Sequence, residues 1–140
     1  MAGLRKLQMT KKKIERLSVI HRREINWLKW YFLRDKKNPK RTILEQKIIV
    51  SHIKNDRLEA KFLTNLKKST EDFVDASDPK YLQAIKEVYI YENMNVIGAC
   101  QKILFYSPTQ AYVLLNAWFN DYFRATYTEL LENAILDKEP

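Results

Sequence analysis

The chain holds 140 residues, 46% of them hydrophobic and 12% aromatic, which excludes a wholly disordered protein and fits a single domain with an appended arm. Two glycines and four prolines are too few for the turns of a β-sandwich or barrel, so the composition predicts an all-α fold. Residues 1–41 hold 14 Lys and Arg against 3 Asp and Glu, whereas residues 42–140 hold 11 against 14. This asymmetry predicts a basic arm that contacts a polyanion, nucleic acid first and an anionic membrane second.

The first predicted helix covers residues 4–34 and ends before Pro39. Its apolar residues recur at helical spacing and are interrupted only at His21. They are Ile14, Leu17, Ile25, Leu28 and Phe32. Lys and Arg fill much of the remaining surface, which predicts sequence-independent contacts with phosphate. The predicted phosphate-binding residues are Lys11, Lys12, Lys13, Arg16, Arg22 and Arg23.

This first helix also carries Trp27, Trp30, Tyr31 and Phe32 within six positions. Aromatic side chains at helical spacing usually pack, so we predict that Leu28, Tyr31 and Phe32 belong to the core or to a dimer seam. A stacking surface for nucleic acid, a membrane interface and a groove for a partner protein remain alternatives.

A second long helix is predicted to start at Thr42, where Glu45 completes a capping box, and to run to about residue 68. Its apolar stripe is Leu44, Ile48, Leu58, Phe62 and Leu66. The β-branched run at residues 48–53 leaves a short strand as the alternative. The acidic stretch at residues 69–79 is predicted to be a linker, which divides the chain into residues 1–70 and 71–140.

Asp78 and Pro79 predict the start of a third helix, since a carboxylate cap followed by proline favours a helix N-terminus. Its predicted buried face is Leu82, Ile85, Val88 and Tyr89. Asn95 is predicted to cap the next helix.

Residues 95–123 are strongly apolar but are interrupted by Ser107 and Pro108. The pair predicts a corner: one helix over residues 96–104, then a longer helix capped by Ser107 with Pro108 as its first residue. Two helices joined by a short turn, with apolar inner faces, form a helix-turn-helix. The predicted inner faces are Val96, Ala99, Cys100 and Ile103 against Ala111, Leu114, Leu115 and Trp118.

The sequence "ACQKILFYSPTQAYVLLNAWFNDYF" resembles the C-terminal helix-turn-helix of phage late-transcription regulators of the RinA and ArpU type, which is similar to region four of bacterial sigma factors. The matching residues are Ala99, Cys100, Ile103, Phe105, Ser107, Ala111 and Tyr112, and the resemblance covers about residues 78–134. Two features differ from the family pattern. The stretch from Cys100 to Ser107 is one residue longer, and the second helix holds no cation before Arg124.

The resemblance implies a sequence-specific regulator of phage or prophage late genes that binds double-stranded DNA. The recognition-helix residues would then be Ser107, Thr109, Gln110, Val113 and Asn116. RNA polymerase or another transcription factor is a further expected partner, and a homodimer is left open. Two alternatives remain: a small helical module that docks on a transcription factor or polymerase subunit, and a helical structural or packaging component.

No catalytic, metal or cofactor site is expected. His21 and His52 lie far apart with no ligand at metal-binding spacing, and glycine occurs only at positions 3 and 98. Cys100 has no partner for a disulfide, no signal segment opens the chain, and its apolar runs fall short of the ~20 residues that cross a bilayer. We therefore expect a non-enzymatic protein of the cytoplasm, that of the bacterial host if a phage encodes it, with no membrane partner.

Overall fold

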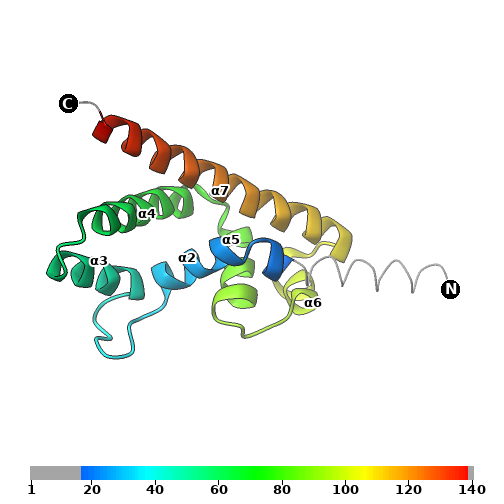
Figure 1. Ribbon diagram of the computed structural model, residues 1–140. Helices are drawn as coiled ribbons and strands as arrows, with labels where there is room; N and C mark the ends of the chain where they lie inside the picture. The colour runs from blue at the N-terminus through cyan, green and yellow to red at the C-terminus, as the bar shows by residue number, and fades with distance from the viewer. Residues whose placement is uncertain (1–16, 139–140) are drawn as a thin grey trace. The chain divides into compact units, whose positions relative to one another are not determined.

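The computed structural model describes residues 17–138, with side chains through residue 130, and all regular structure in this range is helical (Figure 1). Residues 17–20 are helical and precede α2. The elements are α2 (Arg22–Phe32), α3 (Ile43–Ile53), α4 (Arg57–Ala76), α5 (Pro79–Ile85), η1 (Lys86–Ile90), α6 (Val96–Ala99), η2 (Cys100–Leu104) and α7 (Pro108–Lys138), of which η1 and η2 are π-helical turns. The all-α prediction is confirmed, since these residues include no strand.

The described residues form two compact units that interleave along the chain. Unit 1 comprises residues 17–25 and 77–120, and unit 2 comprises residues 26–76 and 121–138. Both α2 and α7 pass from one unit to the other. Each unit therefore takes residues from both sides of the boundary predicted near residue 70.

In unit 2, α3 begins at the predicted capping box. The Glu45 amide donates to Thr42 Oγ1 at 3.1 Å, and the Thr42 amide donates to Glu45 Oε1 at 2.9 Å. The bond from the Thr42 backbone lowers the pKa of Glu45, because it favours the charged carboxylate. The predicted start of this helix is confirmed.

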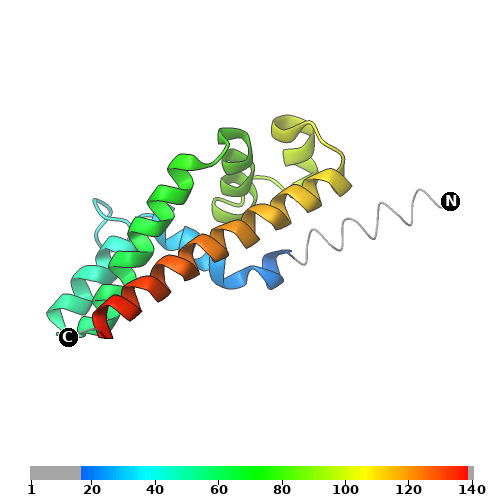
Figure 2. The ribbon, with the colours of Figure 1, turned by 90° about the horizontal axis from the view of Figure 1, so that it is seen from above.

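The predicted second long helix is present as α4, but its continuity from Thr42 is wrong. The chain breaks after Ile53, where Asn55 adopts the left-handed conformation at φ 56°, and Asp56 Oδ1 then accepts the Glu59 amide at 3.1 Å. Figures 1 and 2 show α3 and α4 side by side as separate helices. The break changes the buried face, so Leu58 is 84% exposed. The alternative strand at residues 48–53 is helical as well.

The predicted linker at residues 69–79 is also helical as far as Ala76. Its first two residues are buried and bonded to the part of α7 that belongs to unit 2, from residue 121 onward. The Thr70 and Tyr122 hydroxyls lie 2.7 Å apart, and Ser69 Oγ donates to Thr126 Oγ1 at 3.3 Å. These partners satisfy polar groups that would otherwise favour a turn, and so the helix continues.

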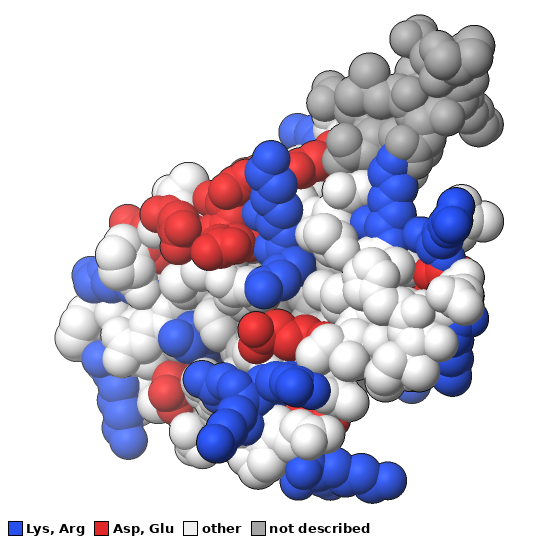
Figure 3. Space-filling model, turned by 90° about the vertical axis from the view of Figure 1, so that its left-hand side faces the viewer, with Lys and Arg blue, Asp and Glu red and all other residues white. Residues whose placement is uncertain are grey.

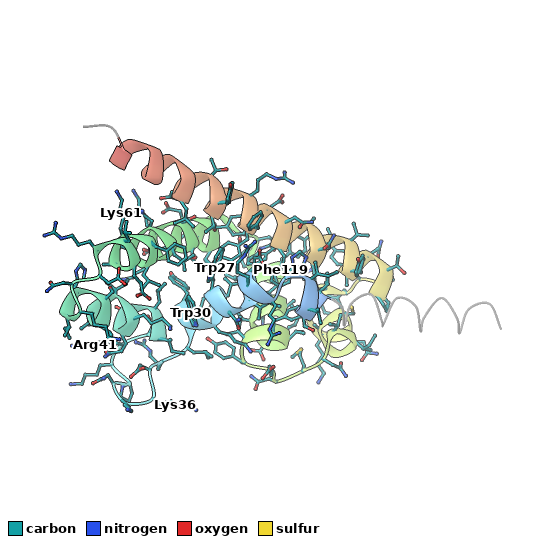
Figure 4. The ribbon with its side chains drawn as sticks, viewed as in Figure 1. Trp27, Trp30, Lys36, Arg41, Lys61 and Phe119 are labelled. Carbon is teal, nitrogen blue, oxygen red and sulfur yellow. The ribbon has the colours of Figure 1, made fainter. Side chains whose placement is uncertain are left out.

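The aromatic cluster of α2 packs partly inside unit 2. Trp27 is 8% exposed, and its ring lies edge-on to Phe62 and Tyr122 with centroids 6.3 and 6.4 Å away. Trp30 is half-buried, and the Lys47 ammonium lies 4.5 Å from its ring centroid (Figure 4). Leu28 is buried as predicted, Tyr31 and Phe32 are half-buried, and Trp27 is a core residue that was not predicted.

In unit 1 both further helix starts are confirmed. Asp78 Oδ1 accepts the Lys80 amide at 2.8 Å, and Asn95 Oδ1 accepts the Gly98 amide at 2.8 Å. Each side chain satisfies an amide that has no partner within its own helix.

His21, which interrupts the apolar stripe, is a buried polar contact of unit 1. Its Nε2 lies 2.8 Å from Asn116 Oδ1, and its ring stacks on Phe119 at a centroid distance of 4.9 Å. The imidazole therefore contributes both a ring face and a hydrogen bond to the packing.

We predict that Tyr122→Phe destabilises the protein by about 1–3 kcal/mol, because it leaves the buried Thr70 hydroxyl without its partner. The double variant Thr70→Val/Tyr122→Phe removes both groups and should recover most of that loss. Urea unfolding followed by circular dichroism measures the free energy of unfolding of each form. Equal stability of the wild type and Tyr122→Phe would contradict the importance of this bond.

Candidate nucleic-acid interface

The predicted corner in unit 1 is formed by α6, η2 and the start of α7. After η2 the Phe105 amide donates to the Cys100 carbonyl at 2.8 Å, a bond that spans five residues. Phe105 itself is left-handed at φ 58°. The chain reverses there and reaches Ser107, so the helical boundaries predicted at residues 104 and 108 are confirmed.

The stretch from Cys100 to Ser107 begins with the π-turn η2. A π-turn bonds each amide five positions back rather than four, and so it holds one more residue than an α-turn. The chain thereby keeps a short connection between the two helices. This turn widens the end of the first helix locally.

The start of α7 is fixed by a reciprocal cap between Ser107 and Gln110. The Gln110 amide donates to Ser107 Oγ at 3.3 Å, and Gln110 Oε1 accepts the Ser107 amide at 3.2 Å. This is the capping-box arrangement, and it confirms Ser107 as the N-cap. The oxygen of the Gln110 side chain is thus held by the cap, which orients the amide group.

Small buried residues allow the elements of the corner to approach closely. The cluster contains three alanines, one cysteine and two larger aliphatic residues, all less than 10% exposed: Ala84, Ala99, Cys100, Ile103, Leu104 and Ala111. Burial raises the pKa of the Cys100 thiol, which therefore stays protonated and acts as a small apolar group. Leu115 and Trp118 are buried as predicted, and Val96 and Leu114 are half-buried.

The predicted recognition residues divide into two groups. Thr109, Gln110 and Val113 lie on the exposed side of α7, where Val113 is 59% exposed. Asn116 is half-buried and its side-chain oxygen is engaged by His21. The corner therefore presents a hydroxyl, an amide and a methyl-bearing side chain, while Asn116 contributes to packing.

Of the predicted phosphate-binding residues, Lys11, Lys12, Lys13 and Arg16 lie outside the described residues. Arg22 and Arg23 are exposed at the start of α2, within unit 1. Arg23 donates to Glu24 Oε1 at 3.2 Å.

The structure adds two residues to the corner, Lys80 and Phe105. The sequence patterns did not indicate a functional role for either of them. Phe105 is 71% exposed, and the Lys80 ammonium lies 5.5 Å from its ring centroid. Beside them, a hydrogen bond with Tyr106 raises the pKa of Tyr81. These contacts join α5 to the turn over about 25 positions, so no local sequence signal predicts them.

No group of three His, Cys, Asp or Glu side chains within the described range could hold a metal ion. None of the helices in that range is long and apolar enough to cross a bilayer. Comparison of the chain with protein families, curated proteins and solved structures finds no match. The geometry of the chain itself is therefore the basis for a functional proposal.

We predict that Phe105→Gly stabilises the protein by about 1 kcal/mol, because glycine adopts the left-handed conformation without the steric cost of a Cβ atom. Phe105→Ala is the matched control: it also removes the ring but keeps the Cβ, and so it should show no gain. Thermal unfolding compares the two variants. A lower melting temperature for Phe105→Gly than for Phe105→Ala would contradict strain at this position.

Proposed function

We propose that this protein is a sequence-specific DNA-binding transcription regulator whose corner in unit 1 acts as a helix-turn-helix. The observation that carries the proposal is the rigid start of α7, where a reciprocal cap holds Ser107 and Gln110 and leaves Thr109, Gln110 and Val113 exposed. Amides contact adenine edges in the major groove, and methyl groups contact thymine. The resemblance to late-transcription regulators of the RinA and ArpU type points to phage late genes.

The cations of the N-terminal segment would supply the affinity that the start of α7 lacks. Residues 1–41 carry a net charge of +11, from 14 basic and 3 acidic residues, whereas α7 has no Lys or Arg before Arg124. Phosphate contacts position a protein on the duplex, and base contacts specify the sequence. The division of labour expected here is phosphate attraction by the basic segment and base contact by the first turns of α7.

The test is selection of duplexes from a random pool by the full chain, followed by binding to the selected duplex. The full chain is needed because unit 1 includes residues 17–25 as well as residues 77–120. Enrichment of a common sequence supports the proposal. No enrichment, with binding that is equal for all duplexes, would refute specific recognition.

We predict that Gln110→Glu weakens binding to the selected duplex about tenfold or more, because a carboxylate cannot donate a hydrogen bond to adenine N7 and is repelled by the phosphates. The variant should fold normally, since Glu at this position of a capping box accepts the same bonds. Gln83→Glu, on the exposed side of α5, is the matched control for the added charge. Equal losses in the two variants would show that Gln110 has no special role.

The second candidate is a module that docks on a transcription factor or polymerase subunit through the corner. It is favoured by the exposed apolar side chains there, Phe105 at 71% and Val113 at 59%, and by the lack of cations on the first turns of α7. A complex with RNA polymerase that survives high salt and is lost in Val113→Lys would support docking. Loss of binding by moderate salt would refute it, since apolar contacts resist salt.

A further inference from the structure

The loop between α2 and α3, residues 33–42, is strongly basic and lies within unit 2. Over eight positions it carries five cations and a single carboxylate, that of Asp35. The cations are Arg34, Lys36, Lys37, Lys40 and Arg41. None of them belongs to the corner of unit 1, and we call this segment the basic loop.

Backbone hydrogen bonds close the two ends of the basic loop. An isolated antiparallel bridge joins Arg34 to Thr42. The Asp35 amide donates to the Arg41 carbonyl at 2.9 Å, and the Ile43 amide donates to the Leu33 carbonyl at 2.9 Å. The loop thus has a defined shape although it contains no helix or strand.

Asp35 fixes the tip of the loop from within. Its Oδ2 accepts the amides of Lys37 and Asn38 at 3.1 and 2.9 Å. The carboxylate is half-buried and bonds backbone groups, and no lysine of the loop pairs with a carboxylate in the described part of the chain. The one acid in the loop shapes it and leaves the ammonium groups to solvent.

The two arginines are held in place by neutral acceptors. Arg34 Nη1 donates to the Lys40 carbonyl at 3.2 Å, and Arg41 Nη1 donates to Gln46 Oε1 at 3.2 Å. A guanidinium has five donors, so each of these bonds occupies one and leaves others for a phosphate. In Figure 4, Lys36 points away from α2 and α3, whereas Arg41 lies beside α3, on which Gln46 accepts its hydrogen bond.

The acids of unit 2 lie both beside the basic loop and away from it: Glu45, at the start of α3, lies near enough to Arg34 for that charge to lower its pKa. Glu71 and Asp75 lie on the last turns of α4, near Tyr31, where their charges add to burial in raising the pKa of that phenol. In Figure 3, Lys and Arg side chains project from the lower edge of the face, the level at which Figure 1 places the basic loop. The basic loop itself has five cations against one carboxylate, and cations in such excess repel one another, a repulsion that a polyanion relieves.

From this fixed shape and this excess of cations, we infer that the basic loop binds the phosphate backbone of duplex DNA, as a second contact separate from the corner of unit 1. The loop is already ordered, and so binding loses little conformational entropy. This inference rests on the proposed function, because it takes the same DNA as its partner. Unit 2 would then position the protein on the duplex without contributing to the recognition of a particular base sequence.

The test compares two triple variants of the full chain on a random-sequence duplex over about 50–200 mM salt. Lys36→Gln/Lys37→Gln/Lys40→Gln removes three charges from the loop, and Lys54→Gln/Lys61→Gln/Lys68→Gln removes three elsewhere in unit 2. We expect the loop variant to lose at least tenfold in affinity at low salt, with a decrease of about two to three in the slope of log K against log salt. The control variant should change that slope by less than about one.

A second comparison separates shape from charge. Asp35→Asn and Asp35→Ala both remove one negative charge, but only Asn retains an oxygen that can accept the two amides at the tip. If the loop acts through its shape, Asp35→Asn binds at least as tightly as the wild type and Asp35→Ala binds several-fold less tightly than Asp35→Asn. Equal affinity of the two variants would overturn the role of a fixed loop.

The remaining outcomes distinguish this inference from the proposed function. Equal losses in the two triple variants, or no loss in either, would overturn the basic loop as a specific phosphate contact while the wild type still binds and selects DNA. Failure of the wild type to bind any duplex at low salt would refute the proposed function and this inference together.

Discussion

The buried stripe of α7 is the constraint on which both units depend. Ala111, Leu115 and Phe119 are buried in unit 1, and Tyr122 and Thr126 are buried in unit 2. Their spacing of three and four residues keeps them on one side of a single helix. An interruption of that helix would remove buried side chains from the core of one unit or the other. Pro108 is therefore acceptable only at the first helical position, where no backbone hydrogen bond is lost.

Local rules predicted the helix starts well. Thr42, Asp78, Asn95 and Ser107 were all expected to cap helices, and each accepts a backbone amide two or three positions further on. A cap involves only a few consecutive residues, so it can be predicted from the local sequence without knowledge of the tertiary fold. The same holds for the exposed placement of Thr109, Gln110 and Val113, which follows once the start of α7 and its buried face are known.

The features that were not predicted depend on contacts between distant residues. The stretch from Ser69 to Ala76 has the composition of a linker, yet it is helical because Tyr122 and Thr126 satisfy its first hydroxyls. Asn116 was expected to face a partner, but a histidine 95 positions earlier engages it. The left-handed Asn55 is a further case, since asparagine permits such a break but does not require it.

The interleaved units have a consequence for synthesis on the ribosome. Unit 1 joins residues 17–25 to residues 77–120, and unit 2 joins residues 26–76 to residues 121–138. The nascent chain cannot complete the core of either unit until α7 has emerged from the ribosome. Until then, the apolar faces of the earlier helices remain exposed to solvent. Such long-range closure slows folding and exposes intermediates to aggregation. Nascent chains of this protein should therefore remain substrates for chaperones until α7 has been synthesised.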